Sequence, residues 1–360
     1  MKKIVSSFIL LFLIFLLCTS SQFVGLVSAN FFPAPVPEHS IEITENGEVN
    51  GTDQIQRNGN LYTFTADIVG SIVVFRSGIV IDGAGYTLQG NGSRTGIWLQ
   101  EKNNVEIKNL HIRNFNHGIQ FTYGMSMDGC TDITLSGNTI TDNEHAITFW
   151  IFSGSNYLLG NTIANNTYGI HIGHCPNNVF RNNQLTNNMH NLWISCETSV
   201  QMTHFINDID TSNTINGKPI IYWVNEQDKT VPSDAGYVAL VNCTNITVQD
   251  QMLTSNSQGI MLVATSNSLI TKNHVTNNDY GIVLFAPYEQ CIGNTITGNN
   301  ITANSKDGIH SCNSENTIVT GNSITNNQEN GINFFDSRGA VISENTILGN
   351  KESNIKIWGH

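Results

Sequence analysis

The feature that most constrains this chain is an apolar residue that recurs at nearly regular spacing. Ten such markers, usually preceded by glycine, are Ile97, Ile119, Ile147, Ile170, Leu192, Ile260, Ile282, Ile309, Ile332 and Ile355. Their steps are 22, 28, 23 and 22 residues in the first group and 22, 27, 23 and 23 in the second. The intervening gap of 68 residues equals three steps of nearly 23. Such a period is typical of a solenoid.

Side chains alternate around each marker as they do in a short strand. Ile170 and Ile172 face one side of such a strand, and His171 faces the other. The segments between markers lack both a helical period and the pattern of leucine-rich repeats. We therefore predict an all-β fold, a right-handed parallel β-helix of about a dozen coils with ~22–23 residues each.

Two columns of asparagine support this register. One column lies two residues before a buried aliphatic residue: Asn138, Asn161, Asn183, Asn273, Asn299, Asn322 and Asn345. The other lies three residues after it: Asn143, Asn166, Asn188, Asn256, Asn278, Asn304, Asn327 and Asn350. Stacked asparagines can hydrogen-bond to their equivalents in neighbouring coils and tolerate the left-handed backbone of tight corners. Both columns are interpreted as structural.

The chain divides into three parts. Residues 1–29 resemble an export signal, with Lys2 and Lys3, an apolar stretch over residues 8–17 and small residues at 27–29. An uncleaved membrane anchor is the alternative for this segment. Residues 30–78 are predicted to form an N-terminal cap and lead-in, and residues 79–360 the β-helix. Turn signals at 216–219 and 232–234 predict one coil with an enlarged loop at 210–238.

Charge and cysteine content limit the partners and the compartment. The formal net charge is −12, and no basic cluster follows Lys3, which excludes a nucleic-acid-binding surface. A neutral glycan is an easier partner than an anionic one. Six cysteines follow the signal segment. Cys175 and Cys196 each lie four residues before a strand-starting valine, so they could form a disulfide or remain two small buried side chains.

The repeats resemble the NosD-like group of β-helix proteins, also described as carbohydrate-binding and sugar-hydrolase (CASH) β-helices. The most specific matching segments are Val80-Ile81-Asp82-Gly83-Ala84-Gly85-Tyr86-Thr87-Leu88 and Asn216-Gly217-Lys218-Pro219-Ile220-Ile221-Tyr222. Sequences with this N-terminal cap look like archaeal secreted or cell-surface members. The resemblance implies the fold; for function it implies an enzyme, a binding protein or a copper-site maturation factor.

Aromatic residues on the outward side of the marker strands are the candidate binding residues. Counted from the markers, the outward positions hold Trp98, Trp150, Trp193, Phe285, Phe335 and Trp358. Exposed aromatic rings can stack on sugar rings, and a clustered exposed apolar patch marks an interaction surface. The alternative is that loops or the cap cover these rings as a second small core.

The sequence identifies no catalytic residues. Asp82 lies in a turn where its carboxylate is expected to cap the backbone. Asp208 and Asp210 share a strand face but lack the partner motifs of polygalacturonase-like sequences. A polysaccharide lyase, hydrolase or epimerase therefore remains the second hypothesis.

A NosD-like copper role is the third hypothesis, implied by the resemblance. The locally paired histidines and methionines are His111 with His117, His171 with His174, Met125 with Met127, and Met202 with His204. No dense ligand cluster appears, so we predict no metal site and no cofactor. We expect a secreted or cell-surface protein that binds glycan through its aromatic face, without catalysis.

Overall fold

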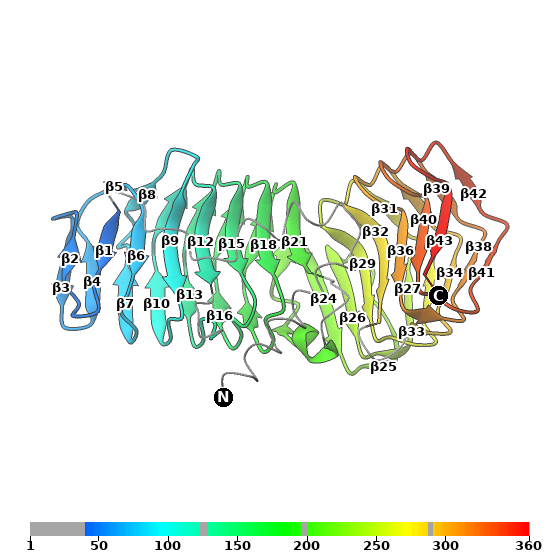
Figure 1. The fold of residues 1–360 in the computed structure, drawn as a ribbon, viewed down its shortest axis with the longest axis horizontal. Coiled ribbons are helices and arrows are strands. Elements are labelled where there is room, and N and C mark those ends of the chain that lie inside the picture. Colours follow the sequence, from blue (N-terminus) through cyan, green and yellow to red (C-terminus); the bar gives the residue numbers. More distant parts are fainter. Residues whose placement is uncertain (1–39, 123–127, 196–200, 287–290, 360) are drawn as a thin grey trace, which may run out of the picture. The chain divides into compact units, whose positions relative to one another are not determined.

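The computed structural model describes residues 40–122, 128–195, 201–286 and 291–359. These residues lie in one compact unit, residues 39–360. The unit is a solenoid of about 12 turns in which each coil contributes short strands to neighbouring sheets (Figure 1). The one helical element among the described residues is a 3-10 helix, η1 (Met202–Phe205). No described helix has the length and apolar character needed to cross a membrane.

Two eight-stranded sheets belong to the first half of the unit. Sheet 1 contains, in order, β2 (Val49–Asn50), β1 (Ile41–Ile43), β6 (Ile72–Val74), β9 (Thr95–Gln100), β12 (His117–Thr122), β15 (His145–Phe149), β18 (Tyr168–Ile172) and β21 (His190–Ile194). Sheet 2 contains β22 (Asp208–Ile209), β19 (Val179–Arg181), β16 (Tyr157–Leu159), β13 (Thr134–Ser136), β10 (Val105–Lys108), β7 (Ile79–Asp82), β4 (Leu61–Phe64) and β3 (Ile55–Asn58).

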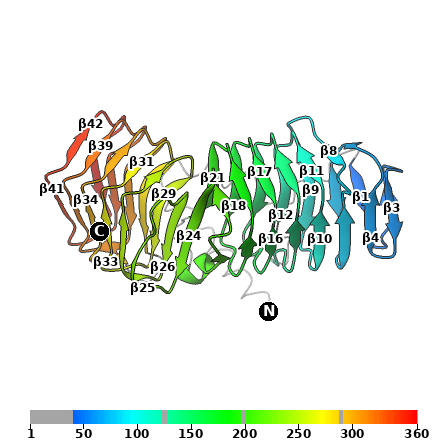
Figure 2. The same ribbon diagram turned by 180° about the vertical axis from the view of Figure 1, so that it is seen from behind.

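Sheet 3 has 14 strands and spans both halves of the unit. Its first-half strands are β5 (Ile68–Val69), β8 (Thr87–Gln89), β11 (His111–Arg113), β14 (Thr139–Thr141), β17 (Thr162–Ala164), β20 (Gln184–Thr186) and β23 (Thr214–Ile215). Its second-half strands are β24 (Lys218–Val224), β26 (Tyr237–Val241), β29 (Gln258–Val263), β32 (Tyr280–Phe285), β36 (Ile309–Cys312), β40 (Ile332–Phe335) and β43 (Ile355–Trp358). We call the coils up to β23 the N-terminal stack and those from β24 the C-terminal stack (Figure 2).

Three smaller sheets complete the C-terminal stack. Sheet 4 contains β25 (Gln227–Thr230), β27 (Thr244–Gln249), β30 (Leu269–Thr271), β34 (Thr295–Thr297), β38 (Ile318–Thr320) and β41 (Val341–Ser343). Sheet 5 contains β28 (Met252–Leu253), β31 (His274–Thr276), β35 (Asn300–Thr302), β39 (Ser323–Thr325) and β42 (Thr346–Leu348). Sheet 6 pairs β33 (Cys291–Ile292) with β37 (Ser314–Glu315).

Parallel pairing in register places like residues above one another. Ile119 on β12 pairs with Ile147 on β15, and both are fully buried. The rings of Phe121 and Phe149 stack inside the core with centroids 4.5 Å apart. A Cβ on Gly118 would lie 2.6 Å from the carbonyl oxygen of Ala146 in the next coil, which explains the glycine that precedes many markers. The predicted parallel β-helix is therefore confirmed.

The asparagine columns form hydrogen-bonded ladders between coils. Asn161 Nδ2, for example, donates to Asn183 Oδ1 at 2.9 Å and to the Leu135 carbonyl oxygen at 2.9 Å. The ladder asparagines are buried and satisfy corner backbone groups that the strands leave unpaired. The left-handed residue is the neighbour before the ladder residue, for example Asn165 (φ 59°) and Asn187 (φ 55°). The predicted structural role holds, and the left-handed conformation lies one residue earlier.

The N-terminal and C-terminal stacks meet at a hairpin. The antiparallel pair β23–β24 turns at Asn216 (φ 50°) and Gly217 (φ 82°), two consecutive left-handed residues as in a type I′ turn. Residues 210–238, for which we expected one coil with an enlarged loop, contain β23, β24 and β25. After the hairpin the marker strands continue in sheet 3, whereas the markers from Ile97 to Leu192 lie in sheet 1.

Replacing Gly217 with alanine is expected to lower the free energy of unfolding by about 1 kcal/mol, because an L side chain is strained at this left-handed position. No heavy atom lies within 4 Å of the position of the added Cβ, so steric contact contributes little. Urea unfolding measures the change, and Asn216→Gly, which retains access to a positive φ, serves as the control. Equal stability of G217A and the parent protein would contradict the strained turn.

The predicted cap region is itself built from strands. Residues 40–78 form β1 to β6, in which β1 pairs antiparallel with β2 and parallel with β6. Tyr62 is fully buried and donates from its hydroxyl to the Gly47 carbonyl oxygen at 2.9 Å. Two antiparallel pairs, β1–β2 and β3–β4, lie at the start of the solenoid and are each joined by a short turn.

Candidate functional site

The outward face of sheet 1 presents side chains in three columns. Strands β9, β12, β15, β18 and β21 pair in register, so residues at the same position in successive coils stack above one another. The outward positions are the first, fourth and sixth, counted from the first residue of each strand; in the five-residue strands the sixth is the residue that follows the strand. We call them columns A, B and C. Column A contains Thr95, His117, His145, Tyr168 and His190; column B contains Trp98, Gln120, Thr148, His171 and Trp193; column C includes Gln100, Thr122, Trp150 and Ser195.

Column A is a continuous stack of rings. The ring centroids of His117 and His145 are 4.7 Å apart, those of His145 and Tyr168 are 4.6 Å apart, and those of Tyr168 and His190 are 4.9 Å apart. The interplanar angles are 19° or less. These separations match the spacing of about 4.8 Å between neighbouring strands, so the pairing register creates the stack.

Column B alternates rings with hydrogen-bonding groups. Trp98 and Trp193 are both partly exposed and lie four strands apart, about 19 Å at the ordinary strand spacing. The His171 ring stacks on the Trp193 ring with centroids 3.9 Å apart. Between the tryptophans, Gln120 is partly exposed, whereas Thr148 is fully buried and its Oγ1 lies 3.1 Å from His117 Nδ1. The column offers apolar ring faces and polar groups in one line.

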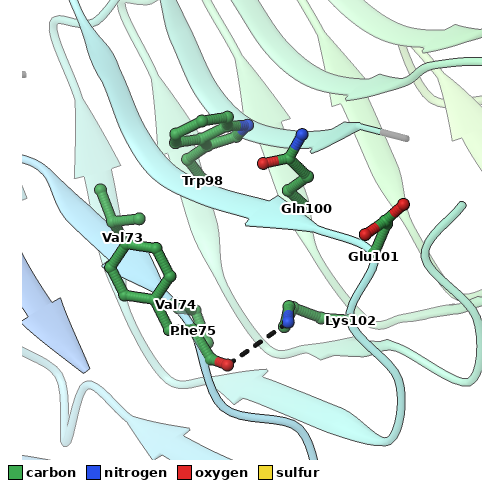
Figure 3. Close-up of a pocket in the computed structure, with 7 residues that line it drawn as sticks. All are labelled: Val73, Val74, Phe75, Trp98, Gln100, Glu101 and Lys102. Carbon is green, nitrogen blue, oxygen red and sulfur yellow. Dashed lines mark hydrogen bonds between the residues drawn. The ribbon is translucent and has the colours of Figure 1, made fainter. Parts of the chain in front are cut away.

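A small cavity lies at the Trp98 end of this face. It encloses about 120 Å³ and is lined by residues 73–75, Trp98 and residues 100–102. Figure 3 shows Trp98 and Gln100 on β9, with Glu101 and Lys102 following them. Lys102 Nζ donates to the Phe75 carbonyl oxygen at 3.3 Å. The cavity therefore combines an aromatic wall with one acidic and one basic side chain.

Burial lowers the pKa values of three histidines on this face, His117, His145 and His171, and so favours their neutral form. Burial, and then the charge of His145, lowers the pKa of His117 to about 3. Burial, and then the neighbouring histidines, lowers the pKa of His171 to about 3. His171 Nε2 lies 2.7 Å from Ser195 Oγ, the pairing of a nucleophile with its base. A base with such a low pKa accepts the serine proton at a cost of about 1.4 kcal/mol per pKa unit, so this pair suits hydrogen bonding rather than catalysis.

The structure divides the predicted aromatic residues between sheet 1 and sheet 3. Trp98, Trp150 and Trp193 lie on the outward face of sheet 1. Phe335 and Trp358 lie on the last two strands of sheet 3, with ring centroids 4.4 Å apart, and Trp358 is 46% exposed. The predicted single face therefore belongs to two sheets.

Phe285 lies on the outward side of its strand but is covered, which is the alternative stated for these rings. Its side chain is 1% exposed and packs against Phe205, with ring centroids 5.6 Å apart. The outward side of the first C-terminal-stack strands faces the end of the N-terminal stack, where Tyr222 and Met261 join the same core cluster. The side chains on this face therefore cover the core at the end of the N-terminal stack.

The acidic residues considered in the sequence have structural contacts. Asp82 Oδ1 accepts from the Ala84 backbone nitrogen at 2.9 Å, as expected for a turn cap. Asp208 and Asp210 both form ion pairs with Arg181. These pairs are partly exposed, and the guanidinium group of Arg181 neutralises the two carboxylates locally. Neither aspartate lies on the sheet 1 face.

Among the described residues, no three or more histidine, cysteine or acidic side chains are placed to hold one metal ion. His111 lies on sheet 3 and His117 on sheet 1, and Met125 and Met127 lie outside the described residues. In column A the parallel rings stack face to face, so their nitrogens do not converge on a common point.

The predicted disulfide partner Cys196 lies outside the described residues. Cys175 is buried, and its Sγ contacts the Gly173 carbonyl oxygen at 2.9 Å. Burial raises the pKa of the Cys175 thiol. The proposed pairing therefore stays a prediction.

Sequence reasoning missed column A. Its members lie two residues before the markers, a signal that alignment of the coils would have found. The histidines that are close along the chain, such as His111 and His117, do not share a position in the coil. The stack of His117, His145 and Tyr168 needs the inter-coil register to become visible.

Two family models match successive parts of the chain. A model described as a right-handed beta helix region matches residues 55–223. A model described as a periplasmic copper-binding protein (NosD) matches residues 197–359. No protein of curated function matches the sequence.

Several solved structures are similar at low identity. A periplasmic alginate epimerase (AlgG) is 14% identical, with 91% of this chain and 69% of that chain covered and a TM-score of 0.32. The mannuronan C-5 epimerase AlgE4 A-module of Azotobacter vinelandii is 14% identical, with 83% and 87% covered and a TM-score of 0.33. The catalytic domain of an α-1,3-glucanase is 13% identical, with 82% and 64% covered and a TM-score of 0.40. Likeness at this level does not extend to activity.

The coil geometry and the two family matches agree over residues 55–359. The chain is thus a right-handed parallel β-helix, and its residues 197–359 are similar to the NosD family model, in line with the resemblance noted in its sequence.

Proposed function

We propose that the outward face of sheet 1 binds an extended glycan without cleaving it. The observation that carries the proposal is column B, in which Trp98 and Trp193 flank polar side chains on one straight line. Aromatic faces stack on the apolar faces of sugars, and the partly exposed amide of Gln120 between the tryptophans can hydrogen-bond to sugar hydroxyls. A flat parallel sheet holds these groups at fixed spacing, which suits a long polymer.

The electrostatics of the face favour a neutral polymer. Burial lowers the pKa values of His117 and His145 in column A, which favours their neutral form, and the formal net charge of the chain is −12. An anionic chain would approach an acidic protein against its overall field. The exposed pair Phe335 and Trp358 offers a second, separate contact on sheet 3.

We also propose that the protein acts outside the cytoplasm, secreted or at the cell surface. The family model that matches residues 197–359 describes a periplasmic protein. The signal-like segment 1–29 supports the same location, although it lies outside the described residues. A glycan of the cell envelope or its surroundings would be accessible there.

Affinity electrophoresis through gels that contain neutral polysaccharides tests the binding proposal. We expect retarded migration of the full chain, and an apparent affinity weaker by about five- to thirtyfold for Trp98→Ala and Trp193→Ala, since each removes a stacking surface worth about 1–2 kcal/mol. Tyr86→Ala, which removes an exposed ring from a turn outside this face, is the matched control. If W98A and W193A were retarded as strongly as the parent protein, binding would not use sheet 1. Shortening of the polymer by the parent protein would contradict non-catalytic binding.

A further inference from the structure

The C-terminal stack contains a buried carboxylate whose two oxygens both accept hydrogen bonds. Asp307 lies two residues before the marker Ile309, and its side chain is 1% exposed. Its Oδ1 accepts from the backbone nitrogen and Nδ2 of Asn330, at 3.0 and 2.7 Å. Its Oδ2 accepts from Asn333 Nδ2 at 2.9 Å and from His310 Nδ1 at 2.9 Å. Burial opposes ionisation, yet the hydrogen bonds from His310, Asn330 and Asn333 hold the Asp307 pKa below its ordinary value.

This carboxylate fixes the tautomer of His310. An ionised carboxylate only accepts hydrogen bonds, so Nδ1 of the imidazole carries the proton and Nε2 carries the lone pair. The His310 side chain is 28% exposed, whereas that of Asp307 is buried. A histidine oriented through Nδ1 by a buried carboxylate is the arrangement that general-base catalysis uses.

Three further groups surround the imidazole. The Tyr280 ring lies 5.2 Å from the His310 ring, and Lys306 Nζ lies 4.8 Å from the centroid of the same tyrosine. Glu329 is close enough for the charges of Asp307, Lys306 and His310 to act on it; burial and the Asp307 charge raise its pKa. The patch thus combines an oriented base, an ammonium group and a carboxyl group of reduced acidity.

We propose that His310 is the general base of a site that hydrolyses carboxylic esters, with Asp307 as its positioning residue. A glycosidic bond is opened by carboxyl groups on both sides of it. Here the oriented group is an imidazole, which suits activation of water toward a carbonyl carbon at neutral pH. The proposal concerns the C-terminal stack and does not depend on glycan binding by sheet 1.

The reaction balances without a further reactant. His310 Nε2 takes a proton from water while the water oxygen bonds to the acyl carbon. Lys306, whose Nζ lies over the neighbouring Tyr280 ring, would extend its positive charge toward the carbonyl oxygen as that oxygen becomes negative. The bond from the acyl carbon to the alcohol oxygen then breaks, and the alcohol oxygen takes the proton from His310 Nε2. A carboxylic acid and an alcohol leave.

Hydrolysis of 4-nitrophenyl acetate by the full chain tests the proposal. We expect His310→Gln to lower the rate above buffer about 100-fold, the usual contribution of a general base. His274→Gln is the matched control, because His274 lies on a strand of the same stack and its Nδ1 faces the amide of Asn300, not a carboxylate. A parent rate no higher than that of H310Q overturns the proposal, including the case in which neither exceeds buffer.

The positioning role of Asp307 has its own readout. Nitrogen NMR of histidine-labelled protein should show His310 protonated at Nδ1 in the parent chain and as a mixture of tautomers in Asp307→Asn. The same variant should lower the ester hydrolysis rate by about tenfold or more after correction for the folded fraction. An unchanged tautomer with an unchanged rate would remove Asp307 from the mechanism.

Discussion

Replacing Asn161 with alanine is expected to lower the free energy of unfolding by about 3–5 kcal/mol, because several buried groups lose their partners at once. Asn161 is 1% exposed. Its Oδ1 accepts from the backbone nitrogen and Nδ2 of Asn138, both at 3.0 Å. Its Nδ2 donates to Leu135 and Asn183, both at 2.9 Å. The methyl group of alanine replaces none of these bonds, and water cannot reach the orphaned groups.

Urea unfolding followed by circular dichroism measures this change. Asn116→Ala is the matched control, because Asn116 is exposed and its side chain is not part of a ladder. We expect that control to change stability by less than about 0.5 kcal/mol, the usual range for surface substitutions. A loss in N161A no larger than in N116A would mean that the ladders do not stabilise the solenoid.

Acidification is expected to destabilise the protein steeply, by about 2–3 kcal/mol per pH unit around pH 5. The folded-state pKa values of His117 and His171 are about 3, whereas histidine in an unfolded chain titrates near 6.5. Between these values the unfolded chain binds about two more protons than the folded chain. The contribution of the two neutral histidines is therefore fully present above about pH 6.5 and is lost as pH falls toward about 3.

Free energies of unfolding in urea, measured at intervals between about pH 7.5 and pH 4.5, give the slope directly. His117→Gln is expected to reduce the slope by about 1.4 kcal/mol per pH unit, the contribution of one proton. His111→Gln, which alters an exposed histidine on sheet 3, should leave the slope unchanged. A parent protein whose stability is flat across this range would contradict the buried, neutral state of His117 and His171.

The asparagine ladders can be predicted from the sequence, whereas the low pKa values of the buried histidines can be seen only in the structure. The asparagine columns are visible in the sequence, because each member keeps a fixed distance from a buried aliphatic residue. The sequence does not say which ladder residues satisfy which carbonyl groups. The low pKa of His171 depends on what surrounds its ring, including Trp193 and Ser195, and that environment comes from neighbouring coils.

The candidate sites likewise combine features that the sequence predicts with features that only the structure shows. The marker period placed Trp98, Trp150 and Trp193 on the outward side of their coils, and the structure places all three there. The same count also placed Phe285 on the outward side of its strand, but there the end of the N-terminal stack covers it. The pairing of Asp307 with His310 was not recognised, although the two residues are only three positions apart.

The sequence by itself determined the β-helix, its coil length and the inward or outward direction of most side chains. These properties are periodic and local, so a count along the chain recovers them. Only the tertiary structure decided which sheet each marker strand joins, because the hairpin at Asn216 and Gly217 moves the later markers from sheet 1 to sheet 3 without changing their period. It also decided which outward faces stay open and which are buried, since coverage comes from coils distant in sequence.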